Sequence, residues 1–505
     1  MKKIVLLSLV GLLILLFTGC GLIPFTTPGV EQPSIEEPPE VPEGLEIGLD
    51  PSVDLELAQS KGPTKHVPSD TGIGTWDSVN RIYTLTTDVN EGIVIDEDNL
   101  TLDGDGHTIT GSGTGYGVYL DQRISVTVKN CVVSGFWYGI YLYSSSSNTL
   151  TANTANNNYD GIFLYDNSNY NTLTDNTANN NVHGISLDSS SSNTLTSNIM
   201  SDNEHNFMLY GSQDSEYDND IDISNTVDGK PIYYIRNAVN QVYDSLTNAG
   251  TFYCINCENV VLRDLTLTKN YIGVFFWKTS NSRIENITVS ENDLGIYLYS
   301  SSSNTLTANT ANDNLHGIFL YSSSSNTLTA NTANDNYLGL RLVNSNDNEV
   351  YNNFINNSMI QADVSGGSGN VFNSDKPIGG NYWSDHTSPD VDYDGFVDSA
   401  YIFTGGQDDL PWVCQDGWKP TGSTVYLITT VEDFGLPKGI KKSLTVLLEA
   451  AINALENHHE QAAIGQLTGF IHHVEAQNGK KLTEEQAQML IATAKRIIDS
   501  IKLSI

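Results

Sequence analysis

Positive charge, sulfur and long apolar runs are all scarce in this chain of 505 residues. It holds 24 Lys and Arg residues against 60 Asp and Glu residues, which gives a formal net charge of −36. The electrostatic field of this negative charge repels nucleic acid and anionic surfaces, so no nucleic-acid partner is expected. Hydrophobic residues still make up 39% of the chain, with 25 Tyr, so it has enough apolar surface to bury a core and is not disordered overall.

The one long apolar run opens the chain. Two lysines precede the apolar segment 4–17, which is too short to be read first as a membrane-spanning helix and has the pattern of a signal peptide over residues 1–20. Cys20 follows a Thr-Gly dipeptide and resembles the cysteine of a lipobox, which implies lipidation of Cys20. The alternative is an ordinary secretory signal. The expected location is extracytoplasmic, in the periplasm or at the cell surface, with a lipid anchor in the membrane.

Proline is scarce outside one segment. Nine of the 15 prolines fall between residues 21 and 70, among several glutamates. Proline stiffens such a segment and like charges extend it, so residues 21–70 are expected to form a tether.

Cysteine is scarce as well, with four residues after Cys20. Cys254 and Cys257 form a CxxC motif in a strand-like run, without a second pair or a nearby histidine. Small buried side chains are therefore favoured there over a zinc or redox site.

What the chain has in abundance is a repeat of 22 to 23 residues. The motif Asn-Thr-Leu-Thr begins at positions 148, 171, 193, 304 and 326, and a second motif, Gly-Ile-x-Leu, alternates as a half-buried strand does. A fixed period of this length indicates a solenoid. Leucine-rich repeats share the period but need more leucine and helical segments, whereas Gly, Asn and Ser favour tight turns. The expected fold is mainly β, a parallel β-helix over residues 71–412 with about 22 residues per coil.

Each copy of the repeat is expected to form one coil. Leu306 and Ala311 are predicted to point inward, and one column of inward residues is expected to run from Val118 to Leu340 through Phe207 and Val274. The segment 211–256 breaks the period and is expected to form a longer coil or a hairpin. Asparagine tolerates left-handed turns and can bond coil to coil in an amide ladder. The predicted ladder contains Asn153, Asn176, Asn198, Asn309, Asn331 and Asn353.

Three motifs carry a family resemblance: YTLTTDVNEGIVIDEDNLTLDGDGHTI from Tyr83, NTVDGKPIYYI from Asn225 and GGNYWSDHTSPDVDYDGFVDSAYIF from Gly379. With them, residues 75–412 resemble the right-handed parallel β-helix of the NosD family (periplasmic copper-binding protein type), within the wider CASH group of carbohydrate-binding proteins and sugar hydrolases. The resemblance implies copper handling as one function. Soft copper sites need Met, Cys or clustered His, and with only five Met a bound copper is not favoured.

The pattern changes after Pro420. Apolar residues at helical spacing predict helices near 444–455 and 463–474, and Thr483 with Gln486 forms a capping box ahead of a third helix. The sequence GFIHHVEAQNGKKLTEEQAQMLI resembles the FIMAH domain, which implies an accessory module. A linker over 413–435 and a three-helix domain over 436–505 are therefore expected.

The acidic segment PDVDYDGFVD is a candidate metal site. Its ligands would be the side chains of Asp390, Asp392, Asp394 and Asp398 and the carbonyl of Phe396, at the spacing of an EF-hand loop that lacks the closing Glu. Hard oxygen ligands suit calcium, so a structural calcium ion is predicted; the alternative is an acidic surface turn.

Aromatic residues alternate with the inward positions of the Gly-Ile-x-Leu strands, so they are predicted to point outward in two exposed columns along one face. Rings with polar tips suit sugar faces, and exposed apolar bands mark interaction sites. The alternatives are stacking that strengthens the sheet, or cover by residues 211–256 or by the C-terminal module. The predicted carbohydrate-binding residues are Tyr119, Tyr141, Tyr143, Phe163, Tyr165, Phe275, Trp277, Tyr297, Tyr299, Phe319 and Tyr321.

Catalysis is not favoured, because the regular coils carry Thr and Ser where an active site needs charge, and no catalytic residue is assigned. The predicted function is non-catalytic binding of a polysaccharide or a surface protein by a membrane-tethered lipoprotein. The first alternative is a carbohydrate-active enzyme, a polysaccharide lyase or a glycoside hydrolase.

Overall fold

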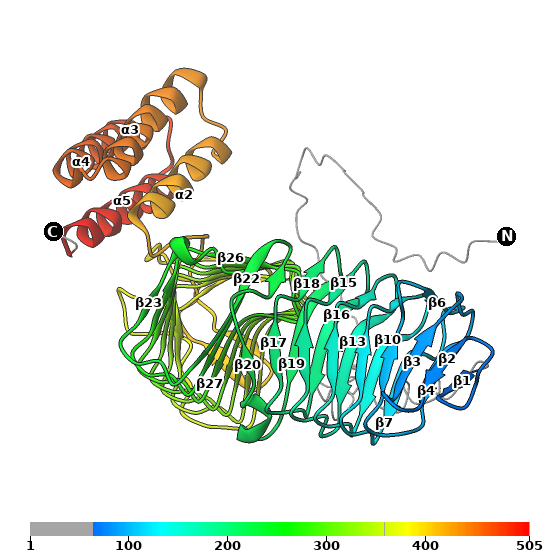
Figure 1. Ribbon diagram of the computed structural model, residues 1–505. Helices are drawn as coiled ribbons and strands as arrows, with labels where there is room; N and C mark the ends of the chain where they lie inside the picture. The colour runs from blue at the N-terminus through cyan, green and yellow to red at the C-terminus, as the bar shows by residue number, and fades with distance from the viewer. Residues whose placement is uncertain (1–63, 358, 504–505) are drawn as a thin grey trace, which may run out of the picture. The chain divides into compact units, whose positions relative to one another are not determined.

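The computed structural model describes residues 64–357 and 359–503. The predicted signal peptide, Cys20 and nearly all of the tether lie outside the described residues. Within the described residues, no helix is long and apolar enough to cross a membrane. The repeat builds coils of short strands, as predicted, and strands at equivalent positions of successive coils lie side by side (Figure 1).

The coils form two stacks, of which the first spans residues 64–229. Sheet 1 consists of β1 (Thr64–Val67), β4 (Gly92–Ile95), β7 (Tyr116–Asp121), β10 (Tyr138–Tyr143), β13 (Asp160–Tyr165), β16 (His183–Asp188) and β19 (His205–Tyr210). Sheet 2 consists of β2 (Gly74–Asp77), β3 (Ile82–Leu85), β5 (Thr101–Asp103), β8 (Thr127–Lys129), β11 (Thr149–Thr151), β14 (Thr172–Thr174), β17 (Thr194–Thr196) and β20 (Asp220–Ile221). The first half of sheet 3 consists of β6 (Thr108–Thr110), β9 (Val132–Ser134), β12 (Thr154–Ala155), β15 (Thr177–Asn179), β18 (Ile199–Ser201) and β21 (Thr226–Val227).

The second stack spans residues 230–383. Its long strands complete sheet 3: β22 (Lys230–Arg236), β24 (Thr251–Ile255), β27 (Ile272–Trp277), β30 (Leu294–Tyr299), β33 (His316–Tyr321), β36 (Leu338–Val343) and β39 (Ile360–Ser365). Sheet 4 consists of β23 (Val242–Tyr243), β25 (Val261–Arg263), β28 (Arg283–Glu285), β31 (Thr305–Thr307), β34 (Thr327–Thr329) and β37 (Glu349–Tyr351). Sheet 5 consists of β26 (Thr266–Thr268), β29 (Thr288–Ser290), β32 (Thr310–Asn312), β35 (Thr332–Asn334), β38 (Phe354–Asn356) and β40 (Tyr382–Trp383).

A reversal of the chain separates the two stacks. β21 and β22 pair in antiparallel fashion around Asp228 and Gly229, whose φ angles are 47° and 74°. Two left-handed residues of the type Asp-Gly form the turn that suits a two-residue hairpin. The hairpin expected within 211–256 is therefore confirmed, but the prediction of one continuous inward column is wrong. Phe207 pairs within sheet 1 and Val274 within sheet 3, because the chain reverses between them.

The predicted asparagine ladder is confirmed inside both stacks. Asn309 Nδ2 donates to Asn331 Oδ1 at 2.9 Å, and Asn331 Nδ2 donates to Asn353 Oδ1 at 2.9 Å. Leu306 and Ala311 are fully buried, as predicted. The left-handed position in this turn belongs to the residue before the asparagine, such as Ala308 with φ 57°, and not to the asparagine itself. The asparagine therefore serves hydrogen bonding rather than backbone geometry.

Glycine occupies the second position of most long strands in sheets 1 and 3. A Cβ on Gly184 would lie 2.4 Å from the carbonyl oxygen of Asn206 in the next coil, so the backbones pack too closely for a side chain. The register skips this position, pairing His183 with His205 and then Ile185 with Phe207. The gap falls at the same place in both strands, with Gly184 opposite Asn206, where the two backbones come closest.

The motif from Gly379 closes the second stack. Trp383 is 1% exposed and its Nε1 donates to Asp408 Oδ2 at 2.9 Å, while Asn381 accepts the last hydrogen bond of the ladder from Asn353 at 2.9 Å. The hairpin of β41 (Tyr401–Phe403) and β42 (Gly406–Asp408) supplies Asp408. The motif is thus a cap for the open end of the stack.

The three helices predicted over 436–505 are confirmed as α3 (Lys438–Glu456), α4 (Glu460–Gln477) and α5 (Glu484–Leu503), and a fourth helix that was not predicted, α2 (Pro420–Asp433), precedes them. The predicted capping box is confirmed, since Gln486 N–H donates to Thr483 Oγ1 at 3.1 Å and Thr483 N–H donates to Gln486 Oε1 at 3.0 Å. The prediction of a linker over 413–435 is wrong, because α2 buries Leu427 and Val431 in the helical core.

Candidate functional site

The outward aromatic residues form two groups on two sheets. Those of the first stack lie on sheet 1 and those of the second stack on sheet 3, because the chain reverses between them. The prediction of two columns along one face is therefore wrong. On sheet 1 the residues are Tyr119, Tyr141, Tyr143, Phe163 and Tyr165, and on sheet 3 they are Phe275, Trp277, Tyr297, Tyr299, Phe319 and Tyr321.

The prediction that these rings are exposed is also wrong for most of them. Tyr119, Tyr143, Tyr165, Tyr299 and Tyr321 are half-buried. The others, Tyr141, Phe163, Phe275, Trp277, Tyr297 and Phe319, are at most 8% exposed.

Ring stacking and cover by another segment account for this burial. Tyr297 stacks on Phe319 with 4.8 Å between centroids and 9° between planes, and Trp277 stacks on Tyr299 at 4.2 Å. Tyr217, from the 3₁₀ helix Asp214–Tyr217, covers Trp277 at 4.1 Å, so cover by residues 211–256 is confirmed. Because the faces of the rings pack against one another, the half-buried tyrosines present only their edges and hydroxyl groups to a ligand.

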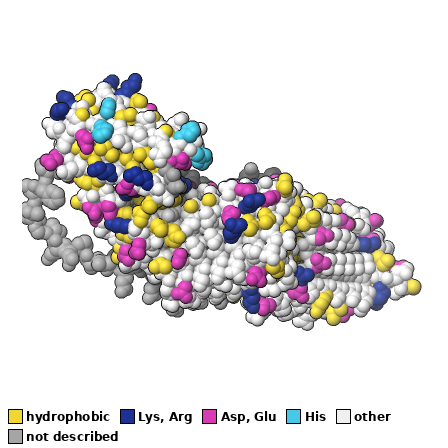
Figure 2. All heavy atoms as spheres, turned by 90° about the vertical axis from the view of Figure 1, so that its left-hand side faces the viewer, with side chains coloured by type: hydrophobic (Ala, Val, Ile, Leu, Met, Phe, Trp, Pro, Cys, Tyr) yellow, Lys and Arg dark blue, Asp and Glu magenta, His cyan; other side chains and the backbone are white. Residues whose placement is uncertain are grey.

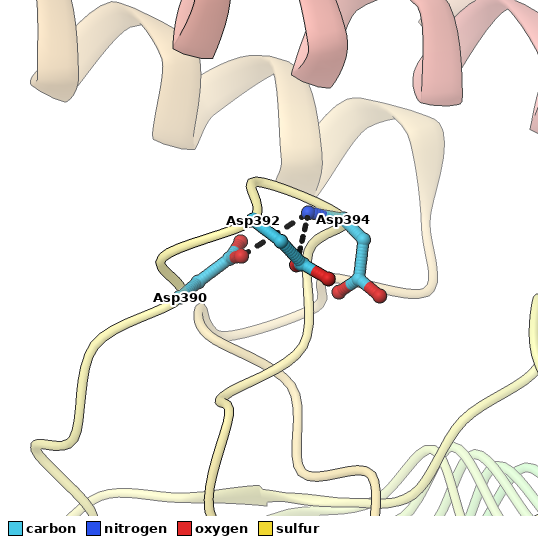
Figure 3. Close-up of side chains that lie close together, drawn as sticks. All are labelled: Asp390, Asp392 and Asp394. Atoms are coloured by element: carbon cyan, nitrogen blue, oxygen red, sulfur yellow. Dashed lines mark hydrogen bonds between the residues drawn. The ribbon is translucent and has the colours of Figure 1, made fainter. Parts of the chain in front are cut away.

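The acidic loop brings together three of its five predicted ligands (Figure 3). Oxygen atoms of Asp390, Asp392 and Asp394 all lie within 4.8 Å of one another. The backbone N–H of Asp394 donates to Asp390 Oδ1 at 3.1 Å and to Asp392 Oδ1 at 3.2 Å, which holds the loop in a tight turn. Asp398 lies outside this trio, and its Oδ2 accepts the Val391 N–H at 2.6 Å.

The electrostatics of the loop favour a cation. The pKa of Asp390 is raised to about 6, mainly by burial and in addition by the charges of Asp394 and Asp392, which together outweigh the opposing backbone hydrogen bonds. Lys376 Nζ forms an ion pair with Asp394. The side chain of Phe396 is buried.

A histidine–aspartate cluster that was not predicted lies where sheet 1 meets the second stack. Two backbone hydrogen bonds join the stacks there, from Asn206 N–H to the Lys269 carbonyl at 2.7 Å and from Tyr271 N–H to the Phe207 carbonyl at 3.2 Å. The junction cluster consists of Asp160, His183 and His205 from sheet 1 and Asp293 from the second stack.

Two carboxylate–histidine pairs make up the junction cluster. His183 Nδ1 lies 2.8 Å from Asp160 Oδ1, and His205 Nε2 lies 3.5 Å from Asp293 Oδ1. The two imidazole rings stack with 5.6 Å between centroids and 14° between planes. Side-chain exposure increases from 3% at Asp160 and 7% at His183 to 11% at His205 and 29% at Asp293, so the cluster opens to solvent on the side of Asp293.

The environment moves the two histidine pKa values in opposite directions. Burial lowers the pKa of His183, but the hydrogen bond and charge of Asp160, with the charges of Asp293 and Glu204, outweigh it and leave the pKa raised. For His205, burial dominates and lowers the pKa. Burial raises the pKa of Asp293 against the pull of the two histidines. Opposite shifts of neighbouring groups are typical of acid and base partners.

The sequence did contain a signal for this cluster. Asp160, His183 and His205 occupy the first position of successive long strands and pair in register. An alignment of the first residue of each long strand, and not only of the apolar positions, would have shown this. That column begins with Tyr116 and Tyr138 and ends with these three ionisable residues. Asp293 could not have been found in this way, because it comes from the other stack.

The residues of the described chain do not fit a copper site. Among the described residues, the cluster of three potential metal ligands is the acidic loop, which offers only carboxylate oxygens. Copper favours Cys, Met and His instead. Cys254 and Cys257 are buried, as predicted, and they form a disulfide inside the second stack, so their sulfur atoms are not free to bind copper. His183 and His205 stack in nearly parallel planes, so their in-plane lone pairs do not converge on one ion.

Several solved structures resemble the solenoid. The catalytic domain of a GH87 alpha-1,3-glucanase, in complex with tetrasaccharides, is 13% identical over 61% of this chain and 69% of its own, with a TM-score of 0.32. An alginate lyase from Paenibacillus sp. is 11% identical over 50% and 94%, with a TM-score of 0.23. The AlgE6 A-module, a mannuronan C-5 epimerase of Azotobacter vinelandii, is 15% identical over 63% and 93%, with a TM-score of 0.23. None of the curated proteins compared with the chain matches it.

Two family models match the chain. Residues 432–499 match the FIMAH domain, which covers α3, α4 and most of α5. Residues 60–232 and 208–388 match the family described as periplasmic copper-binding protein (NosD), and together they span both stacks of coils. The chain thus belongs to the NosD family and carries a FIMAH domain at its C-terminal end.

Proposed function

We propose that the protein binds a neutral polysaccharide through rows of tyrosine hydroxyl groups on the outer faces of its two stacks. The observation that carries this proposal is the pair Tyr299 and Tyr321. Their rings stack at 4.8 Å, both are half-buried, and the buried rings of Tyr297 and Phe319 support them from the same strands. Rigid rings held at the coil spacing offer hydroxyl groups in a row, which suits the repeating hydroxyl groups of a glycan chain.

The charge of the protein supports a neutral ligand. The formal net charge of −36 repels anionic polysaccharides at long range. Figure 2 shows that most of the surface facing the viewer is neither apolar nor charged, with charged side chains scattered over it. Neutral polar surface of this kind binds glycan hydroxyl groups without the cost of stripping water from charges.

The double change Tyr299→Phe and Tyr321→Phe is expected to weaken polysaccharide binding about 30-fold. It removes two hydroxyl groups worth about 1 kcal/mol each and keeps both stacked rings. Affinity electrophoresis measures the change in Kd, and Tyr170→Phe, at a 67% exposed tyrosine on a turn, is the control. Equal affinity of the double variant and the wild type would remove these tyrosines from the binding surface.

We also propose that the acidic loop binds a structural calcium ion through Asp390, Asp392 and Asp394. Three carboxylates gathered on one turn repel one another, and a bound cation relieves that repulsion. Binding would require the ion pair between Lys376 and Asp394 to open. The Asp398 side chain and the Phe396 carbonyl, the other predicted ligands, would complete the shell after a local rearrangement.

Calcium is expected to stabilise the protein by about 2.7 kcal/mol at a concentration 100 times its Kd. Because the pKa of Asp390 is about 6, affinity should fall as the pH drops below 6 and protons compete for its carboxylate. Thermal melting with and without calcium checks this, with Asp390→Asn as the test and the exposed Asp313→Asn as the control. A calcium-dependent rise in Tm that survives Asp390→Asn would place the ion elsewhere.

Membrane attachment through a lipid on Cys20 is the third part of the proposal. The disulfide Cys254–Cys257 supports an oxidising, extracytoplasmic location. The full chain is expected to enter the detergent phase in phase partitioning, and Cys20→Ser to leave it for the aqueous phase. Equal partitioning of the two proteins would contradict lipidation.

A further inference from the structure

A cavity lies near the start of the first stack, where β4 and β7 belong to successive coils. Residues 90–92 line it on the side of β4, and residues 111, 112 and 114–116 line the other side together with Phe136. Its volume is about 100 Å³, whereas one water molecule needs only about 10–15 Å³. Asn90 and Ser112 are exposed, so this β4–β7 cavity is open to solvent and large enough for a small polar molecule.

Tyr116 is the first ring of the aromatic column on sheet 1. Its ring stacks on Tyr119 of its own strand at 4.5 Å and on Tyr141 of the next strand at 5.3 Å between centroids. The preceding strand, β4, has the sequence Gly-Ile-Val-Ile and offers no ring. By the register of β4 with β7, Glu91 holds in the preceding coil the position that Tyr116 holds in its own. The half-buried Tyr116 therefore keeps ring surface for the cavity on the side of β4.

The loop that leads into β7 differs from the equivalent loop of the next coil. It runs over residues 111–115 between β6 and β7, whereas residues 135–137 are enough to join β9 to β10. By the register of β7 with β10, Gly115 takes the place of Trp137, which stacks on Tyr159 at 4.0 Å. Gly115 has a φ of 72°, which favours glycine, and it leaves the place of a third ring in that column unfilled. The longer loop and the missing ring account for the cavity.

The lining of the cavity combines apolar and polar groups. Phe136 is buried and Tyr116 is half-buried, so the aromatic side of the cavity is apolar. The other side chains in the lining are polar and include Asn90, Glu91 and Ser112. Apolar surface with a few polar groups is typical of sites for small molecules. A pyranose ring matches both parts, because it has an apolar C–H face and hydroxyl groups around its edge.

We propose that the β4–β7 cavity binds one pyranose ring of a neutral glycan. The C–H face of the sugar packs on Tyr116. Its hydroxyl groups form hydrogen bonds with the side chains of Asn90, Glu91 and Ser112. The class of ligand rests on the proposed function, whereas the place of binding rests on the cavity itself.

Glu91 selects for a neutral sugar. Its Oε1 lies 3.2 Å from Lys65 Nζ, which holds the carboxylate at the cavity. A carboxylate accepts strong hydrogen bonds from sugar hydroxyl groups, and it repels the carboxylate of an acidic sugar.

The position of the cavity suits a subsite for a longer chain. Tyr119, which stacks directly on Tyr116, is the first of the half-buried tyrosines on sheet 1. A glycan with one ring in the cavity would therefore extend from Tyr116 toward the row of tyrosine hydroxyl groups.

The test titrates the full chain with the methyl glycosides of mannose, glucose and xylose, in a detergent without sugar head groups. Calorimetry is expected to give a Kd of about 1 mM for at least one of them, as a single small ring allows. Ser112→Trp fills the mouth of the cavity, so affinity should fall at least 10-fold while Tm stays unchanged. Ser78→Trp, at an exposed serine in the turn between β2 and β3, is the matched control.

Glu91→Gln tests the hydrogen bonds without changing the size of the cavity. Loss of the charged acceptor is expected to weaken binding of the same glycoside about 10-fold. Its ion pair with Lys65 is partly exposed, so the variant should fold normally.

The outcomes separate this cavity from the rows of tyrosine hydroxyl groups. Retention in a neutral polysaccharide gel, without binding of any of the three methyl glycosides, would overturn the cavity and leave the tyrosine rows intact. Glycoside binding that is lost in Ser112→Trp, without retention in any gel, would support the cavity and overturn the tyrosine rows. Glycoside binding that persists unchanged in Ser112→Trp and Glu91→Gln would overturn the cavity as its site.

Discussion

Replacing Asn331 with alanine is expected to destabilise the second stack by about 3–5 kcal/mol. Asn331 is 1% exposed and its side chain links three coils. Its Nδ2 donates to the Leu306 carbonyl at 2.9 Å and to Asn353 Oδ1 at 2.9 Å, while its Oδ1 accepts the Asn309 N–H at 3.0 Å. Alanine would remove the partner of the buried Leu306 carbonyl and of the buried Asn309 N–H, each at a cost of about 1–3 kcal/mol, whereas Asn353 Oδ1 would still accept the backbone N–H of residue 331.

A urea titration of both proteins checks this expectation through the shift of the unfolding midpoint. Asn334→Ala is the matched control, because Asn334 lies in the same coil but is partly exposed and its Oδ1 has no partner among the described residues. The control should lose less than about 1 kcal/mol. Similar losses in the two variants would show that the ladder adds nothing beyond the ordinary cost of removing an amide side chain.

Replacing Gly295 with alanine should cost about 3 kcal/mol or more, whereas the same change at Gly469 should stabilise the protein by about 0.8–1 kcal/mol. A Cβ on Gly295 would lie 2.5 Å from the carbonyl oxygen of Gly317, so the backbone of one coil would have to move away from the next. Gly469 lies within α4, and its nearest neighbour to a new Cβ is Leu447 Cδ2 at 3.8 Å. There alanine only improves helix propensity.

Thermal melting of the two glycine variants measures these opposite effects. A drop in Tm for Gly295→Ala with a rise for Gly469→Ala is the expected pattern. A neutral result at Gly295 would mean that the coils are not as closely packed as the structure places them, and it would remove the steric reason for glycine at the second position of most long strands.

Features that repeat along the chain could be predicted from the sequence. The 22-residue period, the parallel strands and the asparagine ladder all follow from identical residues at fixed spacing. The capping box of Thr483 and Gln486 was predictable for a different reason, since it depends on residues only three positions apart. Local and periodic information is fully present in a single sequence.

Features that depend on where distant coils meet could not be predicted. The Asp228-Gly229 turn is a hairpin signal, but nothing local shows that the chain direction of a whole stack reverses there. The aromatic residues point outward as predicted, yet their exposure depends on stacking and on Tyr217, which comes from the irregular segment. Asp293 joins His205 only because the two stacks meet, so the junction cluster has no linear motif.

Retention of the full chain in gels that contain neutral polysaccharides tests the binding function most directly. Affinity electrophoresis in detergent, with calcium present, would compare mannan, glucan and xylan gels with gels of an anionic polysaccharide. Slower migration in at least one neutral gel, lost in the Tyr299→Phe and Tyr321→Phe double variant, is the predicted result. Unchanged migration in every neutral gel would contradict polysaccharide binding by the outer faces of the two stacks.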